Sequence, residues 1–129
     1  MDKIGVLVVD DDQDMLKLTA AFLKKEGMEV SCATCGEEAL RLLNLKTFGL
    51  MITDFDMPGM QGCELAERAR EIAPGMPIIM VTGDVTGEAG SRAGEAGILK
   101  VFAKPIRFRE MLETVRSLVR ARNRDSRDE

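Results

Sequence analysis

The sequence predicts an α/β fold with a parallel five-stranded sheet, and two observations support this prediction. Five short apolar segments alternate with five segments of helical periodicity along the 129 residues. The first and fourth apolar segments, residues 4–9 and 77–82, are continuous apolar runs, which is typical of strands buried on both faces of a sheet. Alternating strands and helices of these lengths imply right-handed crossovers, and therefore neighbouring strands that run parallel.

The first two strand–helix units have clear boundaries. The helix after residues 4–9 ends at two lysines and a glycine, a common C-terminal signal of helices. The apolar face expected for this helix consists of Met15, Leu18, Thr19, Phe22 and Leu23. The second strand, residues 28–33, alternates and is expected at an edge of the sheet, with Cys32 pointing into the core. Thr34 and Glu37 have the spacing of a capping box that opens the second helix.

The remaining three units follow the same pattern. Residues 50–53 form the third strand, and a turn with Pro and two Gly precedes a third helix that ends before Pro74. Its apolar face is expected to carry Leu65, Ala66, Ala69 and Ile72. The helix expected near residues 86–96 contains Gly87, Gly90 and Gly94, each costing about 0.5–1 kcal/mol relative to Ala, so we expect local instability there. Residues 98–103 form the fifth strand, and the last helix has apolar residues at three- and four-residue spacing up to Val119.

Composition excludes several classes of function and suggests the compartment. The chain has no His, which excludes Ser/His and Cys/His triads, His-based metal sites and a histidine phosphoacceptor within it. The formal net charge of −4 argues against direct nucleic-acid binding by this domain. No apolar run reaches the roughly 18 residues of a membrane span, and residues 1–3 show no signal peptide. Three cysteines make a disulfide framework improbable, so we expect a reducing, cytoplasmic location without membrane association.

Four of the five predicted strands end at an ionisable or hydroxyl side chain. These side chains are Asp10 and Asp11 after the first strand, Asp54 after the third, Thr82 at the end of the fourth and Lys104 after the fifth. Parallel strands bring their carboxyl ends to one edge, where open α/β sheets bind ligands, so we expect these groups to meet in one crevice. Helix capping accounts for Asp12 or Asp14 instead.

Such a set of groups has the chemistry of phosphoryl transfer. Two unit charges 4 Å apart interact by about 4 kcal/mol at an effective dielectric constant of 20, so clustered carboxylates favour a bound cation or raised pKa values. Oxygen ligands without His or thiolate favour a hard ion, and Mg²⁺ fits such a site. Asp54 could act as a nucleophile and form an acyl phosphate, with the ion, Lys104 and Thr82 holding the phosphoryl oxygens.

Four segments together resemble the response-regulator receiver domain of two-component signalling. They are Val-Val-Asp-Asp at 8–11, Thr-Asp-x-x-Met-Pro-Gly-Met-x-Gly at 53–62, Val-Thr-Gly at 81–83 and Lys-Pro at 104–105, within a resemblance that covers about residues 3–119. The resemblance implies a flavodoxin-like (βα)5 three-layer sandwich with strand order 2-1-3-4-5. We divide the chain accordingly into a receiver domain, residues 1–120, and a polar C-terminal tail or start of a linker, residues 121–129.

The same resemblance implies a role for each site residue. Asp54 is the phosphoacceptor, and Mg²⁺ is held by Asp11, Asp54, the backbone carbonyl of Asp56 and, through water, Asp10. Thr82 and Lys104 sense the phosphate, and the Lys104–Pro105 bond is cis. The implied switch region consists of Gly83, Val101, Phe102 and Pro105. Many receivers carry Tyr or Phe where this chain has Val101, so we expect the movement of Thr82 to be read out by other means.

The resemblance also implies partners. The phosphoryl donor is a histidine on a sensor kinase or phosphotransfer protein, the chain acts as a signalling domain and not as an enzyme, and an unidentified downstream protein or output domain receives the signal. The usual output surface, formed by the fourth helix, fifth strand and fifth helix, is also a candidate homodimer face. Its expected exposed residues are Glu88, Arg92, Glu95, Lys100 and Arg109.

Two alternatives stay open at this point. One is a receiver-like interaction module that is never phosphorylated. The other is a small phosphohydrolase of the haloacid-dehalogenase kind, because Asp54-Phe55-Asp56 has the form of its Asp-x-Asp motif, although that motif should follow the first strand.

Overall fold

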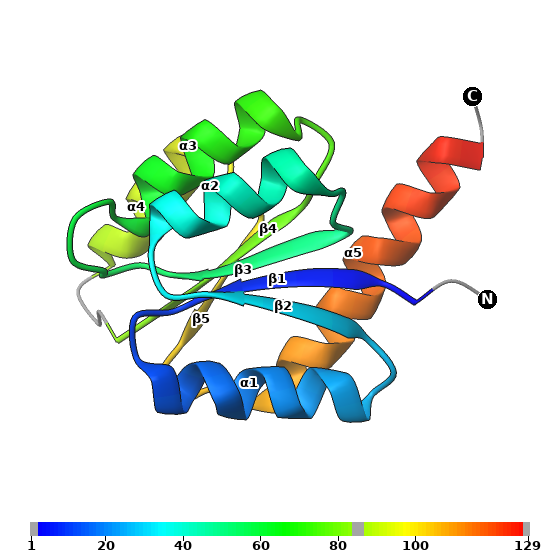
Figure 1. The fold of residues 1–129 in the computed structure, drawn as a ribbon, viewed down its shortest axis with the longest axis horizontal. Coiled ribbons are helices and arrows are strands. Elements are labelled where there is room, and N and C mark those ends of the chain that lie inside the picture. The colour runs from blue at the N-terminus through cyan, green and yellow to red at the C-terminus, as the bar shows by residue number, and fades with distance from the viewer. Residues whose placement is uncertain (1–2, 84–86, 128–129) are drawn as a thin grey trace.

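The protein forms a three-layer α/β sandwich, seen in a computed structural model that describes residues 3–83 and 87–127 (Figure 1). All five strands are parallel and lie in the order β2-β1-β3-β4-β5, which confirms the predicted fold class and strand order. The elements in chain order are β1 (Gly5–Val9), α1 (Gln13–Lys25), β2 (Glu29–Ala33), α2 (Gly36–Leu45), β3 (Leu50–Asp54), α3 (Gly62–Ile72), β4 (Ile78–Thr82), α4 (Glu88–Glu95), β5 (Lys100–Ala103) and α5 (Phe108–Arg127).

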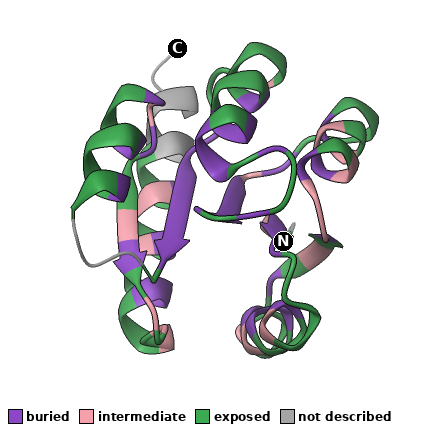
Figure 2. Cartoon of the chain, turned by 90° about the vertical axis from the view of Figure 1, so that its left-hand side faces the viewer, coloured by how far each residue is buried: buried purple, intermediate pink, exposed green. Residues whose placement is uncertain are grey.

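The apolar strand residues divide into two cores because successive side chains of a strand point to opposite faces of the sheet. Val6, Val8 and Ile52 belong to the core shared with α1 and α5. Leu7, Val9 and Met51, whose side chains point to the opposite face, belong to the core shared with α2, α3 and α4. The central strands β3 and β4 are buried along their whole length, as Figure 2 shows by their purple colour. Burial on both faces explains why these strands read as continuous apolar runs.

Local signals at helix ends were predicted with mixed success. Asp12 is the N-cap of α1 and accepts hydrogen bonds from the backbone N–H groups of Asp14 and Met15, as predicted. The capping box at Thr34 was wrong, because the N-cap of α2 is Cys35 and no side chain caps this end. The last helix continues to Arg127, so helix covers most of the segment predicted as a polar tail, and the domain division at residue 120 stays a prediction.

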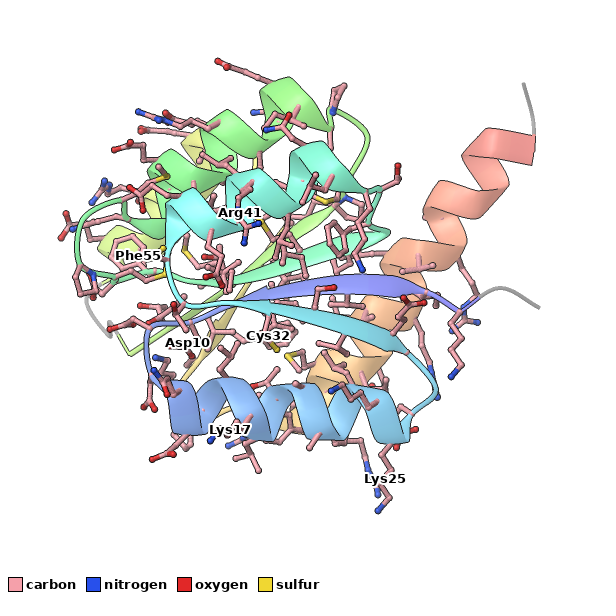
Figure 3. All side chains as sticks on the ribbon, viewed as in Figure 1. Asp10, Lys17, Lys25, Cys32, Arg41 and Phe55 are labelled. Carbon is pink, nitrogen blue, oxygen red and sulfur yellow. The ribbon has the colours of Figure 1, made fainter. Side chains whose placement is uncertain are left out.

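Three apolar side chains predicted to be buried are exposed. Leu18 on α1 is 54% exposed because it lies on the side of the helix opposite the buried residues, and Ile72 at the end of α3 is 38% exposed because it lies at the margin of the buried face. Cys32 is also exposed, although it pairs with the buried Val8 of β1. β2 is an edge strand with a neighbouring strand on one side only, so Cys32, labelled in Figure 3, is less covered than Val8 in the middle of the sheet.

Within the described parts of the chain, residues 3–83 and 87–127, no helix is both long enough and apolar enough to cross a membrane.

Candidate functional site

The carboxyl ends of the strands lie at one edge of the sheet and carry the predicted side chains. Asp10 directly follows β1, Asp54 is the last residue of β3, Thr82 is the last residue of β4, and Lys104 directly follows β5. Figure 3 labels Asp10 at this edge, beside the start of α1. The structure therefore places at one edge the groups that the sequence predicted to converge.

Three carboxylates form a compact cluster at this edge. Asp10, Asp11 and Asp54 each place a carboxylate oxygen within 4.8 Å of the others. Asp10 and Asp54 are buried, each 7% exposed, whereas Asp11 is exposed. Burial raises the pKa of both Asp10 and Asp54 above the ordinary value. Repulsion by Asp10 raises the pKa of Asp54 further, and repulsion by Asp11 and Asp12 raises the pKa of Asp10 further.

Lys104 supplies the opposing charge. Its Nζ lies 3.1 Å from Oδ1 of Asp54, and this ion pair lowers the pKa of Asp54 against the effect of burial. Burial alone lowers the pKa of Lys104, but the hydrogen bond and charge of Asp54 outweigh it, so the pKa of Lys104 is raised. The ammonium group is therefore charged at neutral pH and is directed at the carboxylate of Asp54.

Backbone hydrogen bonds hold these side chains in place. The backbone N–H of Asp12 donates to Oδ1 of Asp10 over 3.0 Å, and the backbone N–H of Phe55 donates to Oδ1 of Asp54 over the same distance. The N–H of Lys104 donates to the carbonyl oxygen of Thr82 over 2.8 Å, which joins the ends of β4 and β5. Thr82 itself is buried, 3% exposed. The site is thus fixed mainly by main-chain geometry at the ends of the strands.

Gly62, the first residue of α3, closes the loop after Asp54. Its N–H donates to the carbonyl oxygen of Phe55 over 3.0 Å, and a Cβ at this position would overlap the backbone carbonyl oxygen of Asp54. A residue larger than Gly would therefore displace the segment that carries the Asp54 carboxylate. Met57 and Met60 of the same loop are buried and pack in the core shared with α2, α3 and α4. Sequence reasoning treated Gly62 only as part of a motif and missed its close contact.

The other predicted residues lie around this cluster. Asp56 has an exposed side chain and is outside the carboxylate cluster, so its predicted ligand role, through the backbone carbonyl, stays a prediction. Gly83 and Pro105 are exposed, and the Lys104–Pro105 bond is cis, as predicted. Val101 packs against the core on the α2–α4 side, whereas Phe102 is buried on the α1–α5 side. All five residues predicted for the output surface, Glu88, Arg92, Glu95, Lys100 and Arg109, are exposed.

The donor set fits a hard divalent cation. Three carboxylates and one ammonium group leave a formal charge of −2, and the ligand atoms available from the three aspartates are all oxygens. Oxygen-only sites of this kind suit Mg²⁺ better than Zn²⁺ or copper, which favour nitrogen and sulfur ligands. Burial is the main cause of the raised pKa values of Asp10 and Asp54, and a bound cation would favour the charged form of both carboxylates.

Comparisons with known proteins agree with this site. The family model of the response regulator receiver domain matches residues 6–116. The chain is 36% identical over 107 residues to a response regulator receiver protein of Anaeromyxobacter sp. (strain Fw109-5), covering 83% of this chain and 45% of that protein. It is 32% identical over 114 residues to the response regulator receiver protein CpdR of Brucella abortus (strain 2308), covering 88% of this chain and 95% of CpdR.

Longer proteins and solved structures are also similar. The transcriptional regulatory protein GlrR of Escherichia coli (strain K12) is 36% identical over 101 residues, or 78% of this chain and 23% of GlrR, so the chain spans less than half of some relatives. A CheY-like receiver domain protein from Methanospirillum hungatei JF-1 has a TM-score of 0.91 at 33% identity and covers 96% of this chain and 99% of that one. The chain therefore belongs to the response regulator receiver domain family of two-component systems.

Proposed function

We propose that this domain accepts a phosphoryl group on Asp54 from a phosphohistidine of a sensor kinase or phosphotransfer protein. The observation that carries the proposal is the ion pair between Lys104 and Asp54, 3.1 Å apart, in a carboxylate cluster of which Asp10 and Asp54 are buried. The Asp54 carboxylate is held there by the charge of Lys104 and by the Phe55 N–H, and this fixed position supports its role as the attacking nucleophile. The chain's lack of His agrees with a donor histidine on another protein.

The proposed reaction is an in-line displacement. A carboxylate oxygen of Asp54 forms a bond to phosphorus while the phosphorus–nitrogen bond to the donor imidazole breaks, and the imidazole leaves with the electron pair. Lys104 and Thr82 then hold two of the phosphoryl oxygens by a charged and a neutral hydrogen bond. Bound Mg²⁺, held by Asp11, Asp54, the backbone carbonyl of Asp56 and, through water, Asp10, would supply positive charge to the same oxygens.

Phosphorylation would then act as a switch. The phosphoryl group carries about −1.5 to −2 charges in place of the single charge of the Asp54 carboxylate, and this larger negative charge attracts the ammonium group of Lys104 and the hydroxyl of Thr82. Lys104 and Thr82 are joined by a backbone hydrogen bond, so the loops after β4 and β5 would shift together, including Gly83 and Pro105. We propose that a downstream protein or output domain, or a second copy of the chain, reads this shift on the face formed by α4, β5 and α5. The cytoplasm, where such donors act, is the proposed location.

The test is labelling by a small phosphodonor. Incubation with acetyl phosphate and Mg²⁺ is expected to add one phosphoryl group, detected by intact mass and removed by hydroxylamine as an acyl phosphate. Asp54→Asn should abolish labelling, and the matched control Asp56→Asn, at the exposed second position of the same Asp-x-Asp, should retain it. Labelling that persists in Asp54→Asn would place the acceptor elsewhere. Failure to bind Mg²⁺ or to be labelled would favour the interaction module, and turnover of a phosphomonoester would favour the phosphohydrolase.

A further inference from the structure

Helix α4 is held to the protein by few apolar contacts. It has only eight residues, Glu88–Glu95, its N-cap Gly87 makes no side-chain capping bond, and its buried side chains are Ala89 and Ala93. Gly90 and Gly94 within the helix each reduce helix stability by about 0.5–1 kcal/mol relative to Ala. Two methyl groups bury little apolar area, so polar side chains contribute much of what keeps α4 in place.

Two arginine contacts attach this helix to the elements beside it. The guanidinium carbon of Arg92 lies 5.4 Å from the centre of the Phe55 ring, a cation–π contact between α4 and the loop after β3. At the other end of α4, Nη1 of Arg70 on α3 donates to the carbonyl oxygen of Ala96 over 3.3 Å. Of these two contacts, only the one from Arg92 reaches the residue next to Asp54.

Phe55 is in turn bound to the candidate phosphoacceptor. Its backbone N–H is shared between Oδ1 of Asp54, at 3.0 Å, and the carbonyl oxygen of Val81, at 2.9 Å. Its ring is buried, 5% exposed, within the core that contains the buried alanines of α4. A closely packed ring has little room to move independently of its backbone, so a shift of the Phe55 N–H moves the ring beneath Arg92.

We propose that the contact between Phe55 and Arg92 couples the chemical state of Asp54 to the position of α4, with Arg92 as a positioning residue. Neutralising or modifying the Asp54 carboxylate alters the hydrogen bond from Phe55, displaces the ring and weakens its attraction to Arg92. The short, glycine-rich helix then shifts or loosens. This inference rests on the proposed function for its physiological trigger, and it gives α4 a connection to Asp54 that does not pass through Val101.

The test measures amide hydrogen exchange of α4, residues 87–97, in the full chain. Four proteins form a double-mutant cycle: the native chain, Asp54→Asn, Arg92→Gln and the double variant. Arg92→Gln is expected to speed exchange of α4 by about two- to fivefold, the factor that corresponds to loss of an exposed cation–π contact. The change that Asp54→Asn causes in the exchange rate of α4 should be at least halved in the Arg92→Gln background. Arg92→Lys keeps the cation and should behave as the native chain does.

Controls separate this coupling from general destabilisation. Lys46→Gln removes a similar contact, with Nζ 5.2 Å from the centre of the Phe48 ring, and should leave α4 exchange unchanged, because Phe48 precedes the start of β3 whereas Asp54 ends that strand. An undiminished effect of Asp54→Asn in the Arg92→Gln background would overturn the proposal, as would equal behaviour of Arg92→Lys and Arg92→Gln. The native and Arg92→Gln proteins are also compared after acetyl phosphate treatment. If the native chain takes no phosphoryl group, the proposed function fails, while the cycle still decides the coupling.

Discussion

Replacing Asp10 by Asn removes one charge from the carboxylate cluster and preserves the shape of the side chain. The amide oxygen of Asn can still accept the hydrogen bond that the backbone N–H of Asp12 donates over 3.0 Å. The substitution therefore isolates the electrostatic contribution of Asp10. We expect Asp10→Asn to raise the free energy of unfolding of the metal-free protein.

The magnitude follows from the distances in the cluster. At the 4.8 Å separation that bounds the cluster, and an effective dielectric constant of 20, the repulsion between the carboxylates of Asp10 and Asp54 is about 3.5 kcal/mol. The lost attraction between Asp10 and Lys104 and solvent screening at the exposed side of the site offset part of it. A net stabilisation of about 1–3 kcal/mol remains, which corresponds to an increase in Tm of about 3–15 °C for a domain of this size.

The assay is thermal unfolding followed by circular dichroism, first with EDTA and then with millimolar Mg²⁺. The native protein should gain stability from Mg²⁺, because binding to the folded state alone stabilises it, and Asp10→Asn should gain much less. Asp14→Asn is the matched control, since Asp14 is an exposed residue in the first turn of α1 outside the cluster. That change should lower stability by a few tenths of a kcal/mol at most, through the helix dipole. An Asp10→Asn protein no more stable than the native chain in EDTA would refute the electrostatic reasoning.

Three further outcomes are expected. In the metal-free state, Asp10→Asn should be no more stable than the native chain below pH 3.8, the ordinary pKa, and its advantage should grow as the pH rises through the raised pKa of folded Asp10. The reason is that the folded native chain holds the Asp10 proton more tightly than the unfolded chain does. Urea unfolding at several pH values measures this difference, and a difference that does not change with pH would contradict it. Lys104→Met should lower the free energy of unfolding of the metal-free protein by about 1–3 kcal/mol, because Asp54 loses its partner at 3.1 Å. The same variant should bind Mg²⁺ more tightly in titration calorimetry. If neither the stability nor the affinity changed, the ion pair between Lys104 and Asp54 would be contradicted. Gly62→Ala should lower the free energy of unfolding by about 2 kcal/mol or more, because its Cβ overlaps the Asp54 carbonyl oxygen. Gly94→Ala, with open space around it, should raise the free energy of unfolding by about 0.5–1 kcal/mol. Equal effects of the two variants in chemical denaturation would show that the close contact is unimportant.

The fold could be predicted because its signals are local and repeated. Continuous apolar runs marked the buried strands, and their alternation with helices fixed a parallel sheet. The order of the strands came from family resemblance, since periodicity carries no information about which strands are neighbours. Cys32 shows the limit of pattern reasoning: alternation gave the correct side of β2, but only the position of β2 at the edge explains its exposure.

The members of the site could be predicted because they follow local strand signals, whereas the contacts that depend on loop paths and helix packing could not. Asp10, Asp54, Thr82 and Lys104 each stand at the carboxyl end of a strand, so parallel topology places them at one edge of the sheet, and the strand order implied by the resemblance brings them close together. The contact of Arg92 with Phe55 joins residues far apart in sequence through the packing of α4, and no sequence signal marks it. The close approach of Gly62 to the Asp54 carbonyl depends on the path of a loop. Its only sequence signal was the Gly itself.

The groups of the carboxylate crevice are spread along nearly the whole chain, from Asp10 to Lys104, and reach it from the ends of β1, β3 and β5. A fragment that lacks any one of these strands lacks part of the crevice, and an unfolded chain holds the charges too far apart to cooperate. We therefore expect cation affinity, as proposed above, to report whether the entire sheet has assembled. Truncations that retain native-like helix content but lose cation binding would reveal incomplete assembly that spectroscopy of the backbone overlooks.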